Sequence, residues 1–151
     1  MDKLEYIPGD LVMTNALGTA KDVVYRVVSS DPSKTLKLDN GTVLKGVVCL
    51  ENIEGAEFGD KGFLSGDCCA WVKDIVPIPL TPEILKKNGW EFYHWFYCSP
   101  NKESAGVCLL SQTGYVWDAH IAGHTLLSDI NSVSDLQHLL FGLGINHEME
   151  V

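Results

Sequence analysis

The first half of the chain consists of short apolar runs separated by turn residues. The runs are Leu11–Met13, Val23–Val28, Thr35–Leu38, Thr42–Leu50 and Ala70–Val76. Asp31-Pro32-Ser33 predicts a turn after the second run, and Asn40-Gly41 predicts a hairpin, because Asn and Gly both tolerate positive φ. About five short strands in about 70 residues favour a small, strongly bent, five-stranded SH3-like barrel. An open meander is the alternative.

Prolines then divide the chain into two parts. Pro77 and Pro79 each lack an N–H group, so strand pairing is expected to stop there. A short helix is expected to follow Thr81, which is suited to cap it. We therefore predict an SH3-like barrel over residues 1–76 and a second unit over residues 77–151.

Two short helices are predicted in the second unit. The first runs from the N-cap Thr81 to Gly89, and the second runs from the N-cap Ser132 to Gly144. Leu136, Leu139, Leu140 and Leu143 lie at i, i+3, i+4 and i+7 of the second helix, so we expect them to share one buried face, with Gln137 more exposed. Strands are expected between the helices, and the whole chain is predicted to be a β-rich α+β protein.

An aromatic run opens the strand region of the second unit. If residues 90–97 form one strand, Trp90, Phe92, His94 and Phe96 share one face and Glu91, Tyr93, Trp95 and Tyr97 share the other. Either the strand is covered on both sides, or one face meets a partner. The face formed by Tyr93, Trp95 and Tyr97 is the candidate interaction surface, because Tyr and Trp combine apolar area with a polar group.

Composition and charge exclude several classes of function. The chain is 46% hydrophobic and 21% charged, which is typical of a globular protein. The formal net charge is −9 and neither half is basic, so direct nucleic-acid binding is not expected. No apolar run approaches the roughly 20 residues that span a bilayer, and the N-terminus lacks the apolar core of a signal peptide. We expect a cytoplasmic protein without membrane contact.

Cysteine and histidine residues are the candidates for chemistry. The five cysteines show no C-x-x-C spacing, and reduced buried thiols are the preferred interpretation. A thiolate–imidazole pair could combine Cys98 or Cys108 with His94 or His120, but no basic residue lies nearby in the sequence to lower a thiol pKa.

Two further patterns resemble ligand sites without completing one. His120 and His124 are four apart, but Gly123 lies between them and the region is predicted to be strand and turn, whereas a zinc site needs several converging ligands. The glycine-rich segment Gly55–Gly66 lacks the phosphate-binding motifs and carries acidic residues. We therefore predict no catalytic, cofactor-binding or metal-binding residues.

The segments Ile78–Trp90 and Leu136–Phe141 resemble those of a family of small uncharacterised proteins from gut bacteria and their phages and prophages. The shared pattern is an I-P-L-T-x-E-x-L joint followed by a C-terminal L-Q-x-L helix. This chain has Ser134 where the family usually shows His, and Gly142 where it usually shows Ala. The resemblance covers most of residues 75–145, and it implies a phage-linked context but no activity.

These observations favour a non-enzymatic protein-interaction or structural accessory protein of a phage or prophage. Its partner is expected to be another protein or a second copy of the chain. The alternative is a small thiol-dependent or hydrolase-like enzyme that uses Cys98 or Cys108 with a histidine. A third hypothesis is a regulator that engages nucleic-acid machinery without touching nucleic acid itself.

Overall fold

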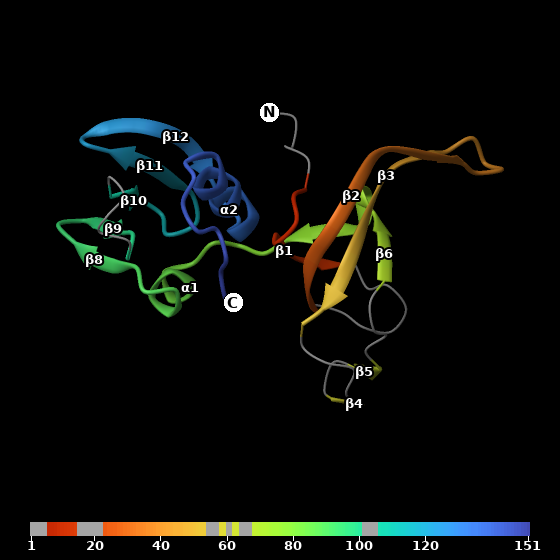
Figure 1. The fold of residues 1–151 in the computed structure, drawn as a ribbon, viewed down its shortest axis with the longest axis horizontal. Coiled ribbons are helices and arrows are strands. Elements are labelled where there is room, and N and C mark those ends of the chain that lie inside the picture. Colours follow the sequence, from red (N-terminus) through yellow and green to blue (C-terminus); the bar gives the residue numbers. More distant parts are fainter. Residues whose placement is uncertain (1–5, 15–22, 54–57, 60–61, 64–67, 101–105) are drawn as a thin grey trace. The chain divides into compact units, whose positions relative to one another are not determined.

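The chain forms two compact units, unit 1 (Met1–Ile78) and unit 2 (Pro79–Val151), each built around its own sheet (Figure 1). This computed structural model describes residues 6–14, 23–53, 58–59, 62–63, 68–100 and 106–151. Strands predominate, and the α-helices of the described residues are two short ones in unit 2, so the prediction of a β-rich α+β protein is confirmed. No helix in these ranges combines the length and the apolar character needed to cross a membrane.

Unit 1 contains a five-stranded antiparallel sheet. Its strands are β1 (Leu11–Thr14), β2 (Val24–Lys37), β3 (Val43–Asn52), β6 (Cys68–Trp71) and β7 (Ile75–Pro77). Their order is β6-β3-β2-β1-β7, so consecutive strands pair and the last strand returns to pair with the first. A separate two-stranded pair joins β4 (Phe58–Gly59) to β5 (Gly62–Phe63), and the rest of the predicted glycine-rich loop lies outside the described residues.

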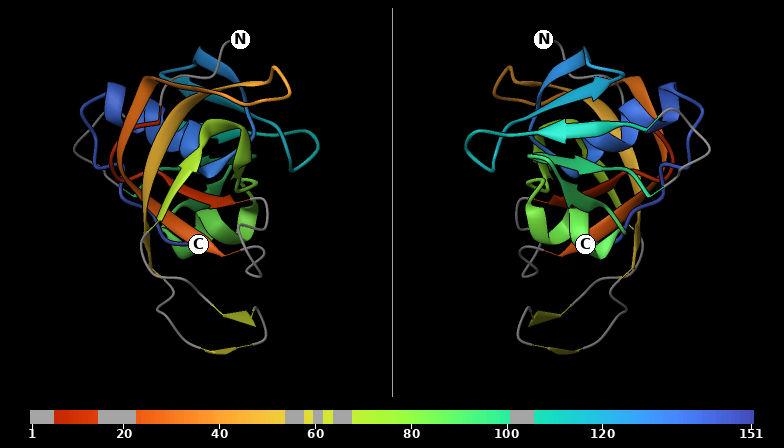
Figure 2. Two further views of the ribbon diagram at one scale, coloured as in Figure 1. Left: turned by 90° about the vertical axis from the view of Figure 1, so that its right-hand side faces the viewer. Right: turned by 90° about the vertical axis from the view of Figure 1, so that its left-hand side faces the viewer.

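The sheet of unit 1 is strongly curved. Strands β6 and β7 are its two edges, yet only the short 3₁₀ turn η1 (Val72–Asp74) connects them. In a flat sheet, edge strands four spacings apart would be about 19 Å from each other. Four Cα steps cover at most about 14 Å, so the sheet has to curl. Figure 2 shows β2 and β3 bent along their length.

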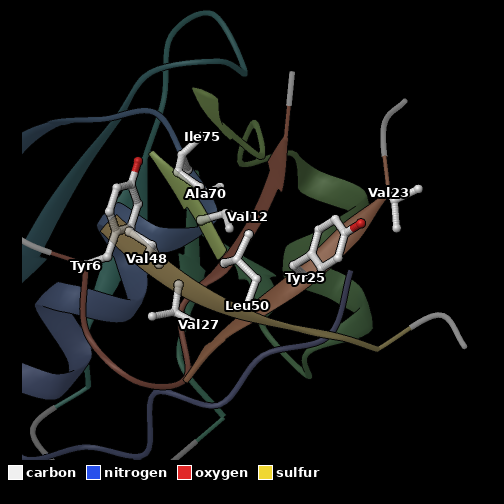
Figure 3. Packing of buried hydrophobic residues seen from close by; sticks show 9 residues of the cluster. All are labelled: Tyr6, Val12, Val23, Tyr25, Val27, Val48, Leu50, Ala70 and Ile75. Atoms are coloured by element: carbon white, nitrogen blue, oxygen red, sulfur yellow. The ribbon is translucent and has the colours of Figure 1, made fainter. Parts of the chain in front are cut away.

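The core of unit 1 is a cluster of nine buried side chains contributed by all five strands and the segments that precede β1 and β2 (Figure 3). They are Tyr6, Val12, Val23, Tyr25, Val27, Val48, Leu50, Ala70 and Ile75. Burial of such apolar surface is the main stabilising contribution to a domain of this size.

The β2–β3 hairpin confirms one predicted turn and corrects another. The turn at Asn40-Gly41 is present: Leu38 N donates to Thr42 O (2.8 Å) and Gly41 has φ +86°. Asp31-Pro32-Ser33, however, does not reverse the chain. It lies inside β2, where Ser33 N and Oγ both donate to Asp31 Oδ1, and the pairing with β3 shifts register there. The local turn is absorbed as an irregularity of one long strand.

Unit 2 contains an antiparallel meander. Its strands are β8 (Glu91–Tyr93), β9 (Phe96–Cys98), β10 (Cys108–Leu110), β11 (Trp117–Ile121) and β12 (His124–Ile130), in the order β12-β11-β10-β9-β8. Tyr97, Leu109 and Ala119 lie directly opposite one another on β9, β10 and β11, and all three are buried. This row marks the core-facing side of the sheet.

The two helices of unit 2 begin and end with the predicted chemistry. Helix α1 (Pro82–Lys87) is capped by Thr81 Oγ1, and helix α2 (Val133–Gly142) is capped by Ser132 Oγ, which accepts from the backbone N–H of Asp135. After α1, Gly89 has φ +81° and after α2, Gly144 has φ +70°. In both cases the N–H of the glycine and the N–H of the residue after it donate to carbonyl groups of the last helical turn, as in a Schellman motif. These predicted ends are confirmed.

The buried face of α2 differs from the predicted one. Leu136 and Leu140 are buried, but Leu143 is exposed, and Gln137 is fully buried. The Gln137 side chain donates from Nε2 to the backbone carbonyl of His147 (3.0 Å), in the chain segment that follows the helix. Its polar group is thereby satisfied, which removes the main cost of burying it. The prediction of an exposed Gln137 was wrong.

Candidate functional site

The aromatic run predicted as one strand is a hairpin. Strand β8 ends at Tyr93 and β9 begins at Phe96, and these two residues are paired, so His94 and Trp95 alone form the turn (Figure 1). The alternation that placed Tyr93, Trp95 and Tyr97 on one face does not survive this reversal. In the hairpin each residue of β8 shares a face of the sheet with its partner on β9. Tyr93 therefore shares a face with Phe96, and Phe92 shares a face with Tyr97.

The turn has an unusual sequence for its backbone. His94 has φ +46° and Trp95 has φ +74°, and two successive positive φ values are the signature of a type I′ hairpin turn. Such turns ordinarily carry Asn-Gly, because a side chain with a Cβ atom is disfavoured at positive φ by roughly 1–2 kcal/mol. The protein places its largest side chain at the position that favours glycine most.

Exposure divides the predicted surface. Trp95 is 80% exposed and Tyr93 is 64% exposed, whereas Tyr97 is only 9% exposed and belongs to the core. The ring of Tyr97 packs edge-on against Trp117, with centroids 5.6 Å apart. The assignment of Tyr97 to an accessible interaction surface was therefore wrong, and Tyr93 and Trp95 are the accessible members of the predicted set.

A second loop lies at the same end of the sheet. Because the strands form an antiparallel meander, the β8–β9 turn and the β10–β11 loop lie at one end, and Tyr115 in that loop is 72% exposed. The loop is held by Ser111, whose hydroxyl donates to Val116 O and accepts from Gly114 N. Its shape is thus fixed by its own hydrogen bonds.

We call this set of exposed side chains, Phe92, Tyr93, Trp95 and Tyr115, the aromatic end of unit 2. Phe92 is 58% exposed and its ring lies 5.1 Å from that of Tyr97, so the core supports it from one side. Tyr93 contacts the imidazole of His94 edge-on, with centroids 4.0 Å apart. Residues of this kind are enriched at the centres of protein interfaces.

Unit 2, which carries the aromatic end, has a negative net charge. Unit 2 holds 3 Lys or Arg and 8 Asp or Glu residues, which gives 3 − 8 = −5. Glu91 is exposed one residue before Phe92 on β8. Glu91 and the net charge of unit 2 therefore favour a positively charged neighbour.

A row of thiols and an imidazole crosses the face of the sheet opposite the core. Cys98 lies opposite Cys108, and Cys108 lies opposite His120. The two Sγ atoms are 3.4 Å apart, and Thr125 Oγ1 lies 3.4 Å from His120 Nδ1. The structure thus brings together three of the four candidates for the thiol–imidazole pair. The fourth, His94, lies in the β8–β9 turn.

The environment of Cys108 does not activate its thiol. Burial, and next the neighbouring Cys98, raise the pKa of Cys108 to about 11. Cys108 is therefore protonated at neutral pH, whereas a nucleophilic cysteine needs a lowered pKa. Cys108 is therefore not favoured as the nucleophile of the thiol enzyme that the sequence left as an alternative.

The two histidines that are four residues apart, His120 and His124, lie on opposite faces of the β11–β12 hairpin. His120 pairs with Thr125 and His124 pairs with Ile121, with Ala122-Gly123 as the turn between them. Neighbouring positions on a strand point to opposite sides, so the two imidazoles diverge. Across the described part of the chain, no three His, Cys, Asp or Glu side chains lie close enough to hold a metal ion.

Comparison with known proteins finds no match to this chain among protein-family models, curated proteins or solved structures.

The aromatic end contains two residues that the sequence analysis did not assign to a surface. Phe92 was placed on the opposite face from Tyr93, and Tyr115 was not assigned to any surface. A signal for Tyr115 was present, because Gln112-Thr113-Gly114 predicts a reversal and places the following residue at the strand end. No comparable signal marks His94-Trp95 as a turn.

Proposed function

We propose that the protein is a non-enzymatic interaction module that holds a folded protein partner at the aromatic end of unit 2. The observation that carries this proposal is Trp95, which is 80% exposed in a turn whose backbone disfavours it. An exposed Trp contributes little to folding, and positive φ at His94 and Trp95 costs stability. Unfavourable backbone geometry that supports no packing is a feature of functional sites.

The partner we propose carries an apolar pocket with a basic rim. The β8–β9 turn projects a large side chain beyond the strands, which fits insertion into a pocket better than contact with a flat surface. The acidic charge of unit 2 supports attraction to Lys and Arg on the partner. The same charge opposes self-association, because two copies of a chain with net charge −9 repel each other.

For unit 1 we propose an SH3-like barrel. The support is the order β6-β3-β2-β1-β7, in which consecutive strands pair and β7 returns to β1, together with the short 3₁₀ connection between the edge strands. The resemblance of Ile78–Trp90 to phage and prophage proteins further supports a role as an accessory protein of such an element. Coat, tail or integrase genes beside the gene would agree with this context, and their absence would count against it.

The test of the binding proposal is a variant that removes the aromatic side chain and keeps the turn. His94→Asn/Trp95→Gly restores the usual type I′ sequence, so the hairpin is retained or strengthened. We expect the wild-type chain to capture a protein from an extract of its source cells and this variant to lose it. With the captured protein purified, titration calorimetry should show a loss in affinity of about 30-fold or more, because a central Trp commonly contributes about 2 kcal/mol.

Phe141→Ser is the matched control. Phe141 is an exposed aromatic residue, 57% accessible, but it lies on α2 and not at the aromatic end. The control should bind the purified partner like the wild type. Binding by His94→Asn/Trp95→Gly within about twofold of the wild type, well below the loss expected of a hot-spot residue, would contradict the proposal. Wild-type dimers in sedimentation that the variant abolishes would identify a second copy as the occupant.

A further inference from the structure

Unit 1 brings two cysteines of adjacent strands into contact. Cys49 on β3 and Cys69 on β6 lie directly opposite each other, and their Sγ atoms are 2.9 Å apart. The flanking pairs Val48–Ala70 and Leu50–Cys68 keep the same register. Residues directly opposite in an antiparallel ladder have Cα atoms about 4.5–5.5 Å apart, within the range that a disulfide spans. No backbone movement is required to join the two sulfur atoms.

The pair is accessible and its two members differ. Cys69 is exposed and Cys49 is half-buried, on the side of the strand away from the core residues Val48 and Leu50. The hydrogen bond from the Cys69 thiol, and next one from Ser29, lower the pKa of Cys49. A lowered pKa and solvent access are the two conditions for a reactive cysteine.

We propose that Cys49 and Cys69 form a redox site, in which Cys49 reacts with a hydroperoxide and Cys69 then closes a reversible disulfide between β3 and β6. The Cys49 thiolate attacks one peroxide oxygen, the O–O bond breaks, and the leaving alkoxide or hydroxide takes a proton. Cys49 becomes a sulfenic acid. The Cys69 sulfur then attacks the Cys49 sulfur, the S–O bond breaks, and the departing hydroxide leaves as water with the Cys69 proton.

The overall reaction is balanced. Two thiols lose two electrons and two protons. An organic hydroperoxide is reduced to an alcohol and one water, and hydrogen peroxide is reduced to two waters. A dithiol reductant reverses the reaction by thiol–disulfide exchange. The disulfide would link the edge strand β6 covalently to β3. Oxidation would therefore change the edge of the sheet in unit 1.

Unit 2 supplies the matched control. Cys98 and Cys108 are also directly opposite on adjacent strands, with Sγ atoms 3.4 Å apart. They differ in chemistry, because burial and Cys98 raise the pKa of Cys108 to about 11. The same sheet geometry therefore occurs once with an activated thiol and once with a protonated one, and we expect only the Cys49–Cys69 pair to oxidise readily.

The test treats the full chain with about one equivalent of hydrogen peroxide, blocks the remaining thiols by alkylation, and digests with trypsin. Cleavage after Lys45, Lys61 and Lys73 places Cys49 in one peptide and Cys68 and Cys69 in another. We expect these two peptides to appear linked, about 2 Da lighter than the sum of the reduced peptides. Fragmentation should assign the link to Cys69. Oxidation of Cys98–Cys108 should be at least about tenfold slower.

Variants test the two roles separately. Cys68→Ser should keep the link, and Cys69→Ser should leave a sulfenic acid on Cys49 that dimedone traps. Circular dichroism checks that each variant keeps the wild-type fold. A link through Cys68, equal rates for the two cysteine pairs, or no linked peptide in the wild-type chain would each overturn the proposal. Detection of the linked peptides in the wild-type chain tests the proposed disulfide even if a variant fails to fold.

Discussion

The sheet of unit 2 contains two tight turns with the same backbone geometry and different residues. His94-Trp95 joins β8 to β9 with φ +46° and +74°, and Ala122-Gly123 joins β11 to β12 with φ +50° and +79°. At the second central position, one turn has glycine and the other has tryptophan. Glycine adopts this backbone conformation without strain at position 123, but tryptophan occupies the equivalent position 95.

The two turns differ in how well their residues suit the backbone geometry that they share. At Gly123 an added Cβ would meet no atom within 4 Å, so glycine is needed there only for its positive φ. At Trp95 the same backbone requirement is overridden. The β8–β9 hairpin tolerates this because Tyr97, two residues after Trp95, fixes β9 in the core.

The largest effect is expected at the buried end of the aromatic run. Tyr97→Ala should lower the free energy of unfolding by about 3–5 kcal/mol, because the ring is buried against Trp117 and Phe92. Urea unfolding followed by circular dichroism and Trp fluorescence measures the loss. A cost below about 1 kcal/mol, close to that of a surface substitution, would mean that β9 does not anchor the hairpin.

A smaller effect is expected at the glycine turn. Gly123→Ala should cost about 0.5–1 kcal/mol net, because backbone strain at positive φ exceeds the entropy that alanine removes from the unfolded chain, and the new Cβ has open space around it. Gly106→Ala is the matched control, since its Cβ would also meet open space and its φ is not positive. That control should be neutral or slightly stabilising, by up to about 1 kcal/mol. Equal changes in the free energy of unfolding for the two variants would contradict the claim that positive φ disfavours a Cβ atom at Gly123 and at Trp95. Urea unfolding of each variant, under the same conditions, measures the change in the free energy of unfolding.

Local chemistry made parts of this fold predictable from the sequence. Thr81 and Ser132 mark helix starts, Gly89 and Gly144 mark helix ends, and Asn40-Gly41 marks a hairpin, because each feature depends on residues within a few positions of one another. The structure has all of these features. The curl of the unit 1 sheet follows only after the strand order is known.

The remaining features depend on contacts between distant residues or on unfavourable local choices. The acceptor for Gln137 is the carbonyl of His147, which lies beyond the helix end, so the helical pattern alone predicted the wrong face. The contact of Cys49 with Cys69 requires the register of β3 and β6, and no spacing rule supplies it. The turn at Trp95 was missed for a different reason, because propensity rules predict against it.

The smallest effect is expected at Trp95 itself, and it decides between the two roles of the aromatic run. A side chain that is 80% exposed leaves no cavity when it is removed, so Trp95→Ala should change the free energy of unfolding by less than about 0.5 kcal/mol. Trp95→Gly should be more stable than Trp95→Ala by about 0.5–1 kcal/mol, because glycine relieves the strain at φ +74° but gains entropy in the unfolded chain. Urea unfolding of both variants measures this difference, which has the opposite sign to the effect of Gly123→Ala. A core residue would behave otherwise, since Trp→Ala in a core costs about 3–5 kcal/mol. A loss of that size at Trp95 would show that the residue serves stability, and it would leave the proposed interaction surface without its central anchor.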